Sequence, residues 1–193
     1  MKRKIVIFAS GTGSNTINII KYFEGNRDIS VSHVFSNKKD APVLEKAEKL
    51  GVISIAFDRN ALYSDNQILH ILKDIKPEII VLAGFLWIFP DKIISEFPNK
   101  VINIHPALLP NYGGKGMYGM KVHEAIVKDK ATETGISIHF VNEKYDEGEI
   151  IFQKSIPVDP SDTPSEVAQK IHQLEHEYFP QVIEKLLNSK SGS

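Results

Sequence analysis

The sequence has 193 residues, which is enough for one sizeable hydrophobic core and short for two domains. Apolar residues make up 42% of the chain and charged residues 24%, as in an ordinary globular domain, and the net charge of -1 gives no general attraction to nucleic acid or to anionic membranes. The chain contains no cysteine, which excludes disulfides, cysteine-based metal sites and a cysteine nucleophile.

The first 104 residues alternate between apolar runs of strand length and segments with helical spacing of apolar residues. Strands are expected at residues 5–9, 31–35, 52–56, 78–83 and 100–104. Helices are expected at residues 14–23, 41–50, 61–75 and 91–96. Continuous apolar strands that alternate with helices are typical of a doubly wound, mostly parallel, Rossmann-like α/β sheet.

The pattern changes after residue 104. A Gly-rich loop at residues 111–120 precedes a helix at residues 121–128. Two strands at residues 134–141 and 149–158 are separated by a short loop, which favours a hairpin, and a long helix follows at residues 163–187. We therefore expect an antiparallel C-terminal extension of the sheet and a long closing helix.

The segment at residues 10–15, Ser-Gly-Thr-Gly-Ser-Asn, links the first strand to the first helix. Glycines let the backbone approach an anion, and the free N–H groups at a helix N-terminus favour phosphate. A dinucleotide site would need a third glycine where Thr16 stands and an acid where the second strand ends at Ser36. The loop therefore favours a mononucleotide-sized or sugar phosphate. A tight turn with Ser14 as helix N-cap explains the same residues equally well.

The fifth expected strand runs into Asn103, His105 and Pro106. Side chains two positions apart on a strand point to the same side, so the amide and the imidazole can face one pocket at a sheet edge where ligands bind. Such a pair can polarise a carbonyl and hold the negative charge that develops on attack. A nearby carboxylate would favour the charged imidazole, and the downstream candidates are Asp146 and Glu147. On these residues alone, a structural role for His105 is the more common outcome.

Together the motifs resemble the phosphoribosylglycinamide formyltransferases, the folate-dependent glycinamide ribonucleotide transformylase family of purine biosynthesis. The resemblance runs from residue 5 to about residue 187 and is carried by IVIFASGTGSN, VFSNKKDAPVLEKA, IIVLAGFLWIF, VINIHPALLP, ETGISIHFV and YDEGEIIFQ. It implies one formyltransferase domain over residues 1–188. Residues 1–100 would bind the ribonucleotide phosphate, residues 101–188 would carry the catalytic and folate-binding part, and residues 189–193 would form a tail.

The resemblance implies a reaction and a set of site residues. The formyl group of the co-substrate 10-formyltetrahydrofolate would pass to the amine of 5'-phosphoribosylglycinamide, giving formylglycinamide ribonucleotide and tetrahydrofolate. Asn103 and a protonated His105 would stabilise the oxyanion, and Asp146 would keep His105 charged. The implied ribonucleotide-binding residues are Gly13, Ser14, Asn15 and Glu175. The implied folate-binding residues are Leu86, Trp87, Ile88, Phe89, Asn103, Val141 and Asn60.

Two positions depart from the family pattern near the implied folate site. Trp87 stands where many members have arginine. Asn60 aligns with another family arginine, thought to meet the folate glutamate tail, and Arg59 next to it is a candidate substitute. In the strand expected at residues 134–141, alternate residues share a face, so Ser137 and His139 are candidates for supporting the site.

We expect small-molecule substrates, no metal, no nucleic-acid or membrane partner, and a cytoplasmic monomer or homodimer. His172 and His176 form no metal-binding motif and are expected to be solvated or structural. The alternative functions are a formyltetrahydrofolate deformylase, a methionyl-tRNA formyltransferase-like enzyme, and a non-catalytic sensor that binds a phosphate ligand through residues 10–15. The sensor predicts that Asn103, His105 and Asp146 do not converge, whereas an enzyme predicts that they surround one cleft facing that loop.

Overall fold

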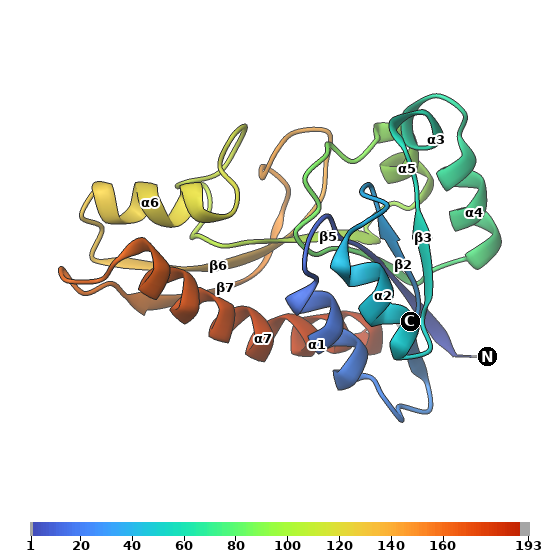
Figure 1. Ribbon diagram of the computed structural model, residues 1–193, viewed down its shortest axis with the longest axis horizontal. Helices are drawn as coiled ribbons and strands as arrows, with labels where there is room; N and C mark the ends of the chain where they lie inside the picture. Colours follow the sequence, from blue (N-terminus) through green and yellow to red (C-terminus); the bar gives the residue numbers. More distant parts are fainter. Residues whose placement is uncertain (1, 190–193) are drawn as a thin grey trace.

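The computed structural model describes residues 2–189, whose strands form one seven-stranded sheet in the order β3-β2-β1-β4-β5-β6-β7 (Figure 1). The strands are β1 (Arg3–Phe8), β2 (Ile29–Ser36), β3 (Ile53–Ala56), β4 (Ile79–Leu82), β5 (Val101–His105), β6 (Glu133–Phe140) and β7 (Ile150–Pro157). β1 to β5 pair in parallel, and β6 and β7 extend the sheet in antiparallel fashion. The expected doubly wound, mostly parallel sheet with an antiparallel extension is confirmed.

Helices cover both faces of this sheet (Figure 1). They are α1 (Ser14–Tyr22), α2 (Pro42–Lys49), α3 (Arg59–Tyr63), α4 (Gln67–Ile75), α5 (Asp91–Glu96), α6 (Met120–Lys128) and α7 (Pro164–Ser189). Ile5 and Ile7 of β1 join the core under α1, α2, α6 and α7, while Val6 and Phe8 join the core under α3, α4 and α5. Because both faces are buried, the central strands read as continuous apolar runs. Within residues 2–189, no helix has the length and apolar character needed to cross a bilayer.

The single helix expected at residues 61–75 is wrong, because the structure divides it into α3 and α4. Asp58 caps the N-terminus of α3 by accepting the Ala61 N–H, so this helix starts earlier than expected. Asn66 has a φ of 56°, a left-handed conformation that interrupts an α-helix. The tail expected at residues 189–193 is wrong for Ser189, which is the last residue of α7, and residues 190–193 lie outside the described residues.

The order of the strands creates a crevice at one edge of the sheet. After β1 the chain adds β2 and β3 on one side, and then returns to add β4 and β5 on the other. The loops that follow β1 and β4 therefore leave in opposite directions at the carboxyl ends of these strands, which is where open α/β sheets bind ligands. This edge brings together residues 10–15, 84–89 and 103–106.

Candidate active site

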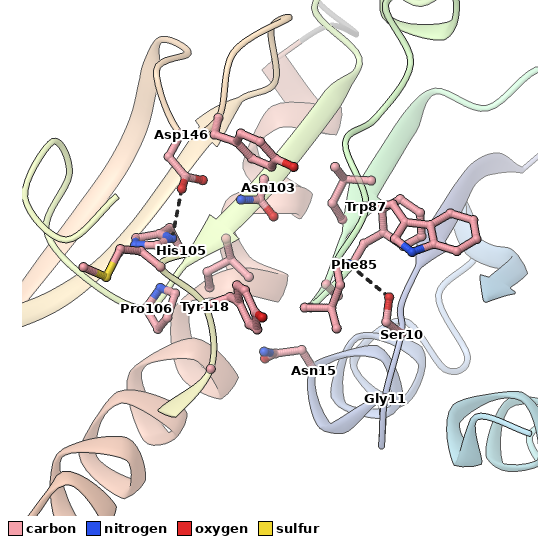
Figure 2. A pocket seen from close by; sticks show the side chains of 18 of the residues that line it. Ser10, Gly11, Asn15, Phe85, Trp87, Asn103, His105, Pro106, Tyr118 and Asp146 are labelled. Carbon is pink, nitrogen blue, oxygen red and sulfur yellow. Dashed lines mark hydrogen bonds and ion pairs between the residues drawn. The ribbon is translucent and has the colours of Figure 1, made fainter. Parts of the chain in front are cut away.

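A cavity of about 810 Å³ lies at this edge of the sheet (Figure 2). Its size is within the range of about 300–1,000 Å³ typical of small-molecule sites. Its walls come from residues 10–15, 82–89, 103–106, 114–120 and 141–146, together with one face of α7. The structure therefore brings the phosphate-loop candidate, the strand-end pair and the Asp146 loop to a single cavity.

Gly13 shapes the loop that enters α1. Its φ is 73°, and a Cβ added there would lie 2.2 Å from the Val43 side chain, so only glycine fits. Gly13 also occupies the N-cap position without any side-chain cap, so the interpretation of Ser14 as N-cap is wrong. The first bond of this helix runs from the Ile17 N–H to the Gly13 carbonyl. The N–H groups of the first turn consequently have no partner within the helix and can bind an anion at the cavity.

The buried Ser10 ties this loop to the segment after β4 (Figure 2). Its hydroxyl donates to Oδ1 of Asn37 at 2.6 Å and accepts the Leu86 N–H at 3.0 Å. Two walls of the cavity are thus held at a fixed separation by one side chain.

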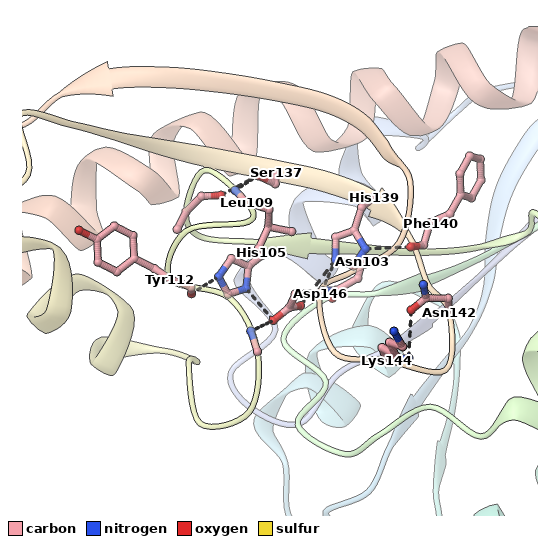
Figure 3. Close-up of polar contacts among 12 residues, drawn as sticks. Asn103, His105, Leu109, Tyr112, Ser137, His139, Phe140, Asn142, Lys144 and Asp146 are labelled. Atoms are coloured by element: carbon pink, nitrogen blue, oxygen red, sulfur yellow. Dashed lines mark hydrogen bonds and ion pairs between the residues drawn. The ribbon is translucent and has the colours of Figure 1, made fainter.

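Asn103 and His105 meet their partners across the antiparallel pairing of β5 with β6, which places His139 opposite Asn103 and Ser137 opposite His105 (Figure 3). Asn103 Nδ2 is 3.2 Å from His139 Nε2, and His139 Nδ1 is 2.8 Å from the Phe140 carbonyl oxygen. Since a carbonyl only accepts, the Nδ1–H group of His139 donates to it, and Nε2 is the ring atom that faces the Asn103 amide. His139 therefore orients the Asn103 amide.

Asp146 contacts both histidines (Figure 3). Its Oδ2 is 3.6 Å from His105 Nδ1 and its Oδ1 is 3.6 Å from His139 Nε2, while Oδ2 accepts the Gly114 N–H at 2.9 Å. Asp146 has a φ of 53°, a left-handed backbone conformation, so the loop turns at this residue.

The same loop requires a glycine at position 148. A Cβ there would lie 1.7 Å from the Phe140 carbonyl oxygen, so no larger residue fits.

The environment of His105 favours the neutral ring. Burial lowers its pKa, and this effect outweighs the Asp146 charge and the hydrogen bond to the Tyr112 carbonyl, which both raise it. Burial would raise the pKa of Asp146, but its contacts with His139, His105 and the Gly114 N–H together lower it. In the free protein the Asp146 charge thus acts towards the protonated ring, as expected, but it does not outweigh burial.

The tautomer of neutral His105 follows from its hydrogen bond. Nε2 lies 2.8 Å from the Tyr112 carbonyl oxygen and donates to it. The lone pair of Nδ1 is then directed towards Asp146, so the ring is able to take up a proton on that side.

Ser137 supports the segment that follows His105. Its hydroxyl donates to the Ala107 carbonyl at 2.7 Å and accepts the Leu109 N–H at 2.9 Å. The Gln153 amide donates both to this hydroxyl and to the Leu109 carbonyl. Ser137 therefore fixes the backbone that follows His105, whereas His139 contacts the Asn103 side chain directly.

The ribonucleotide candidates Asn15 and Glu175 meet although 160 positions separate them. Asn15 Nδ2 donates to Oε2 of Glu175 at 2.9 Å, and Glu175 is only 5% exposed. The same Oε2 lies 2.9 Å from His172 Nδ1, and both α7 residues line the cavity. The sequence interpretation missed His172; its i, i+3 spacing to Glu175 on one helix face was the available signal.

The folate candidates other than Asn60 line the cavity, but their side chains differ in exposure. Leu86 and Ile88 are exposed to about 45% and 44% and line the cavity with the partly buried Trp87. Phe89 is 3% exposed and packs against Phe8 at a ring distance of 5.0 Å. Val141 belongs to another wall of the cavity, next to the Asp146 loop.

Asn60 lies apart from these residues. Its amide donates to Asp65, and it lines neither the main cavity nor an adjoining one of about 440 Å³. Arg59 lines the second cavity, and its guanidinium carbon is 4.8 Å from the ring centroid of Trp87, which belongs to both cavities. A cation is thus present beside the expected folate site, but it comes from Arg59. Among residues 2–189, no group of three or more His, Asp or Glu side chains is arranged to hold a metal ion.

Comparison with known proteins places these features in a family. Residues 3–183 match the family described as Formyl transferase. The chain is 36% identical to the phosphoribosylglycinamide formyltransferase of Bacillus subtilis, over 96% of this chain and 95% of that protein. It is 37% identical to the chloroplastic phosphoribosylglycinamide formyltransferase of Arabidopsis thaliana over 94% of this chain, but it spans only 64% of that relative's length.

Solved structures agree with the sequence relatives. Glycinamide ribonucleotide transformylase 1 from Geobacillus kaustophilus superimposes with a TM-score of 0.87 at 30% identity, covering 97% of this chain and 100% of the other. The match thus extends over nearly the whole chain. The chain therefore belongs to the formyl transferase family.

Proposed function

We propose that this protein transfers the formyl group of 10-formyltetrahydrofolate to the amine of 5'-phosphoribosylglycinamide. The observation that carries the proposal is the convergence of Asn103, His105 and Asp146 in a cavity that also contains the free N-terminus of α1 (Figure 2). A phosphate sensor would need the helix N-terminus but has no use for the three converging side chains. The names of the relatives from Bacillus, Arabidopsis and Geobacillus support the same reaction.

Each substrate has a suitable part of the cavity. The ribonucleotide phosphate binds the first-turn N–H groups of α1 with Gly13, Ser14 and Asn15, and Glu175 accepts from the ribose hydroxyls. The folate binds between the apolar side chains of the segment after β4 and the loop that begins at Val141. Its anionic tail runs over Trp87 to Arg59, which takes the place that the sequence interpretation assigned to Asn60.

Catalysis moves one proton through His105. The glycinamide amine attacks the formyl carbon, which forms a C–N bond and places negative charge on the formyl oxygen. The second N–H of the Asn103 amide donates to this oxygen, and Nδ1 of neutral His105 accepts the proton that the amine loses. The imidazolium lies 3.6 Å from the Asp146 carboxylate, whose charge stabilises it. His105 returns the proton to N10 of the folate as the C–N10 bond breaks, so the neutral ring is regenerated.

Turnover with purified protein tests this function. The protein is mixed with glycinamide ribonucleotide and 10-formyltetrahydrofolate, and the absorbance of the folate product is followed. We expect product only when both substrates are present. Equal product without the ribonucleotide would indicate a deformylase, and no product would favour the sensor. A methionyl-tRNA formyltransferase-like activity would require charged tRNA in place of the ribonucleotide. The cytoplasmic location, the single-domain organisation and the monomeric or homodimeric state stay predictions.

A further inference from the structure

The loop between β5 and α6 contacts both His105 and Asp146 through its backbone (Figure 3). The Tyr112 carbonyl accepts from Nε2 of His105 at 2.8 Å, and the Gly114 N–H donates to Oδ2 of Asp146 at 2.9 Å. The hydrogen bond at one ring nitrogen decides which nitrogen carries the proton of a neutral histidine. The loop therefore controls whether Nδ1 of His105 presents a lone pair towards the carboxylate.

Tyr112 has a backbone conformation that is unfavourable for its residue type. Its φ is 55°, in the left-handed region that a bulky side chain rarely adopts. Such a conformation persists only where the surrounding structure holds it, and it is typical of functional sites. Here its result is a carbonyl group that reaches His105. Some contact must therefore hold Tyr112 in this position.

The backbone that follows Tyr112 cannot provide that contact through side chains. A Cβ added at Gly113 would lie 2.6 Å from the Leu109 side chain and 3.3 Å from the Asp146 Cβ atom, so this position has to be bare. Residues 113–116 contain three glycines. The nearest large side chain that can fix this part of the loop is that of Tyr112 itself.

The Tyr112 side chain has two anchors. Its ring packs against the core under α1, α2, α6 and α7, and Figure 3 shows it pointing away from Asp146. Its hydroxyl lies beside Asp129: burial raises the pKa of the phenol, and the Asp129 charge and a hydrogen bond to that carboxylate raise it further. Asp129 is the C-cap of α6, where the helix dipole disfavours a negative charge. A hydroxyl that donates to Asp129 is therefore favourable there.

We propose that Tyr112 is a positioning residue that holds its own carbonyl against Nε2 of His105 and so keeps the ring in the tautomer that can accept a proton on Nδ1. Asp129 holds the Tyr112 hydroxyl, which connects the C-terminus of α6 to His105 through one side chain. Tyr112 does not line the cavity, so a role in binding substrate does not explain it. The use of this tautomer in formyl transfer rests on the proposed function, whereas the tautomer of the free protein does not.

The 15N NMR spectrum of the imidazole groups tests the proposal on the intact protein without substrates. The signals missing in His105→Gln identify the ring. Above the pKa of His105, the wild type should have its proton on Nε2 alone. Tyr112→Gly still permits the left-handed backbone but removes both anchors, so His105 should populate both tautomers. Asn111→Ala is the matched control, because this neighbouring side chain is exposed, and its spectrum should equal that of the wild type.

Two milder variants test the contact between the hydroxyl and the carboxylate. Tyr112→Phe keeps the packing of the ring and removes the hydroxyl, so its tautomer ratio should lie between those of the wild type and Tyr112→Gly. Asp129→Ala should give the same ratio as Tyr112→Phe. Combining the two changes should add nothing, since each removes the same interaction.

Turnover provides a readout that a loss of general stability would not reproduce. Tyr112→Gly should lower kcat by up to about 100-fold, the effect of a small misplacement of a reacting group. KM for both substrates should stay unchanged, because the side chain is outside the cavity. Thermal unfolding of each variant establishes that the native fold is kept.

Three results would overturn the proposal. The first is the wild-type tautomer of His105 in both Tyr112→Gly and Tyr112→Phe. The second is additive effects of Tyr112→Phe and Asp129→Ala. The third is a raised KM with an unchanged kcat in Tyr112→Gly, which would assign the residue to binding. If the tautomer shifts as expected but the wild type makes no product, the proposed function fails and the positioning role of Tyr112 stands.

Discussion

Asn103 of β5 lies directly opposite His139 of β6, with its amide nitrogen 3.2 Å from the Nε2 atom of that histidine. The His139 tautomer is set in turn by its hydrogen bond to the Phe140 carbonyl. A chain of two hydrogen bonds thus leads from the backbone of β6 to the amide that faces the cavity (Figure 3). The direction of the Asn103 amide is therefore a property of the sheet pairing.

The oxyanion role of Asn103 predicts the effect of Asn103→Ala. Removing one donor of this kind lowers kcat by roughly a hundred- to thousandfold, and KM should change little because the interaction forms in the transition state. Steady-state formyl transfer measures both constants. A kcat within a few-fold of the wild type would remove Asn103 from the mechanism. His139→Ala should give a smaller loss of kcat, since it frees the amide to rotate without removing it.

The buried environment of His105 predicts a lowered pKa for its imidazole and a corresponding pH dependence of formyl transfer. Its pKa should lie below the ordinary value of about 6.5, so the ring is neutral at pH 7 and becomes protonated only under more acidic conditions. Formyl transfer should therefore decline as pH falls through this pKa. Imidazole NMR of the protein gives the midpoint directly. In Asp146→Asn the midpoint should move lower still, because the charge that raises it is gone. A midpoint above the ordinary value would contradict the proton-transfer scheme.

The conformation of Gly13 predicts a loss of stability in Gly13→Ala. A left-handed φ costs a non-glycine residue about 1–2 kcal/mol, and the new Cβ would overlap the Val43 side chain. Chemical denaturation measures the free energy of unfolding, which should fall by at least about 1 kcal/mol. Gly11→Ala is the matched control, since nothing lies within 4 Å of a Cβ there, and it should unfold like the wild type.

The position of Arg59 over Trp87 predicts which side chain meets the folate tail. Arg59→Gln should raise KM for 10-formyltetrahydrofolate up to about fivefold, the range of a partly exposed ionic contact. KM for the ribonucleotide should stay unchanged. Asn60→Ala should alter neither constant, because its side chain faces Asp65. The reverse result, with an effect only in Asn60→Ala, would restore the sequence-based assignment.

Several features could be predicted from the sequence because they depend on local geometry. Apolar runs and helical spacing gave the alternation of strands and helices. The two-residue spacing of Asn103 and His105 placed both side chains on one side of a strand, since this period is built into the extended backbone. The glycines at residues 10–15 predicted an anion site, because a backbone without side chains at the start of a helix can approach an anion closely. The family resemblance chose Asp146 among the candidate carboxylates and supplied Glu175, which no local pattern identifies.

Other features were decided only by the tertiary structure, because they depend on segments far apart in the chain. The register of β5 against β6 chose His139 as the partner of Asn103, and the packing of α7 against α1 joined Glu175 to Asn15. The lowered pKa of His105 follows from its burial in the folded protein. This effect outweighs the charge of Asp146, the carboxylate that the sequence analysis singled out. Short-range periodicity is a property of the backbone, whereas proximity and desolvation are set by how the elements pack together.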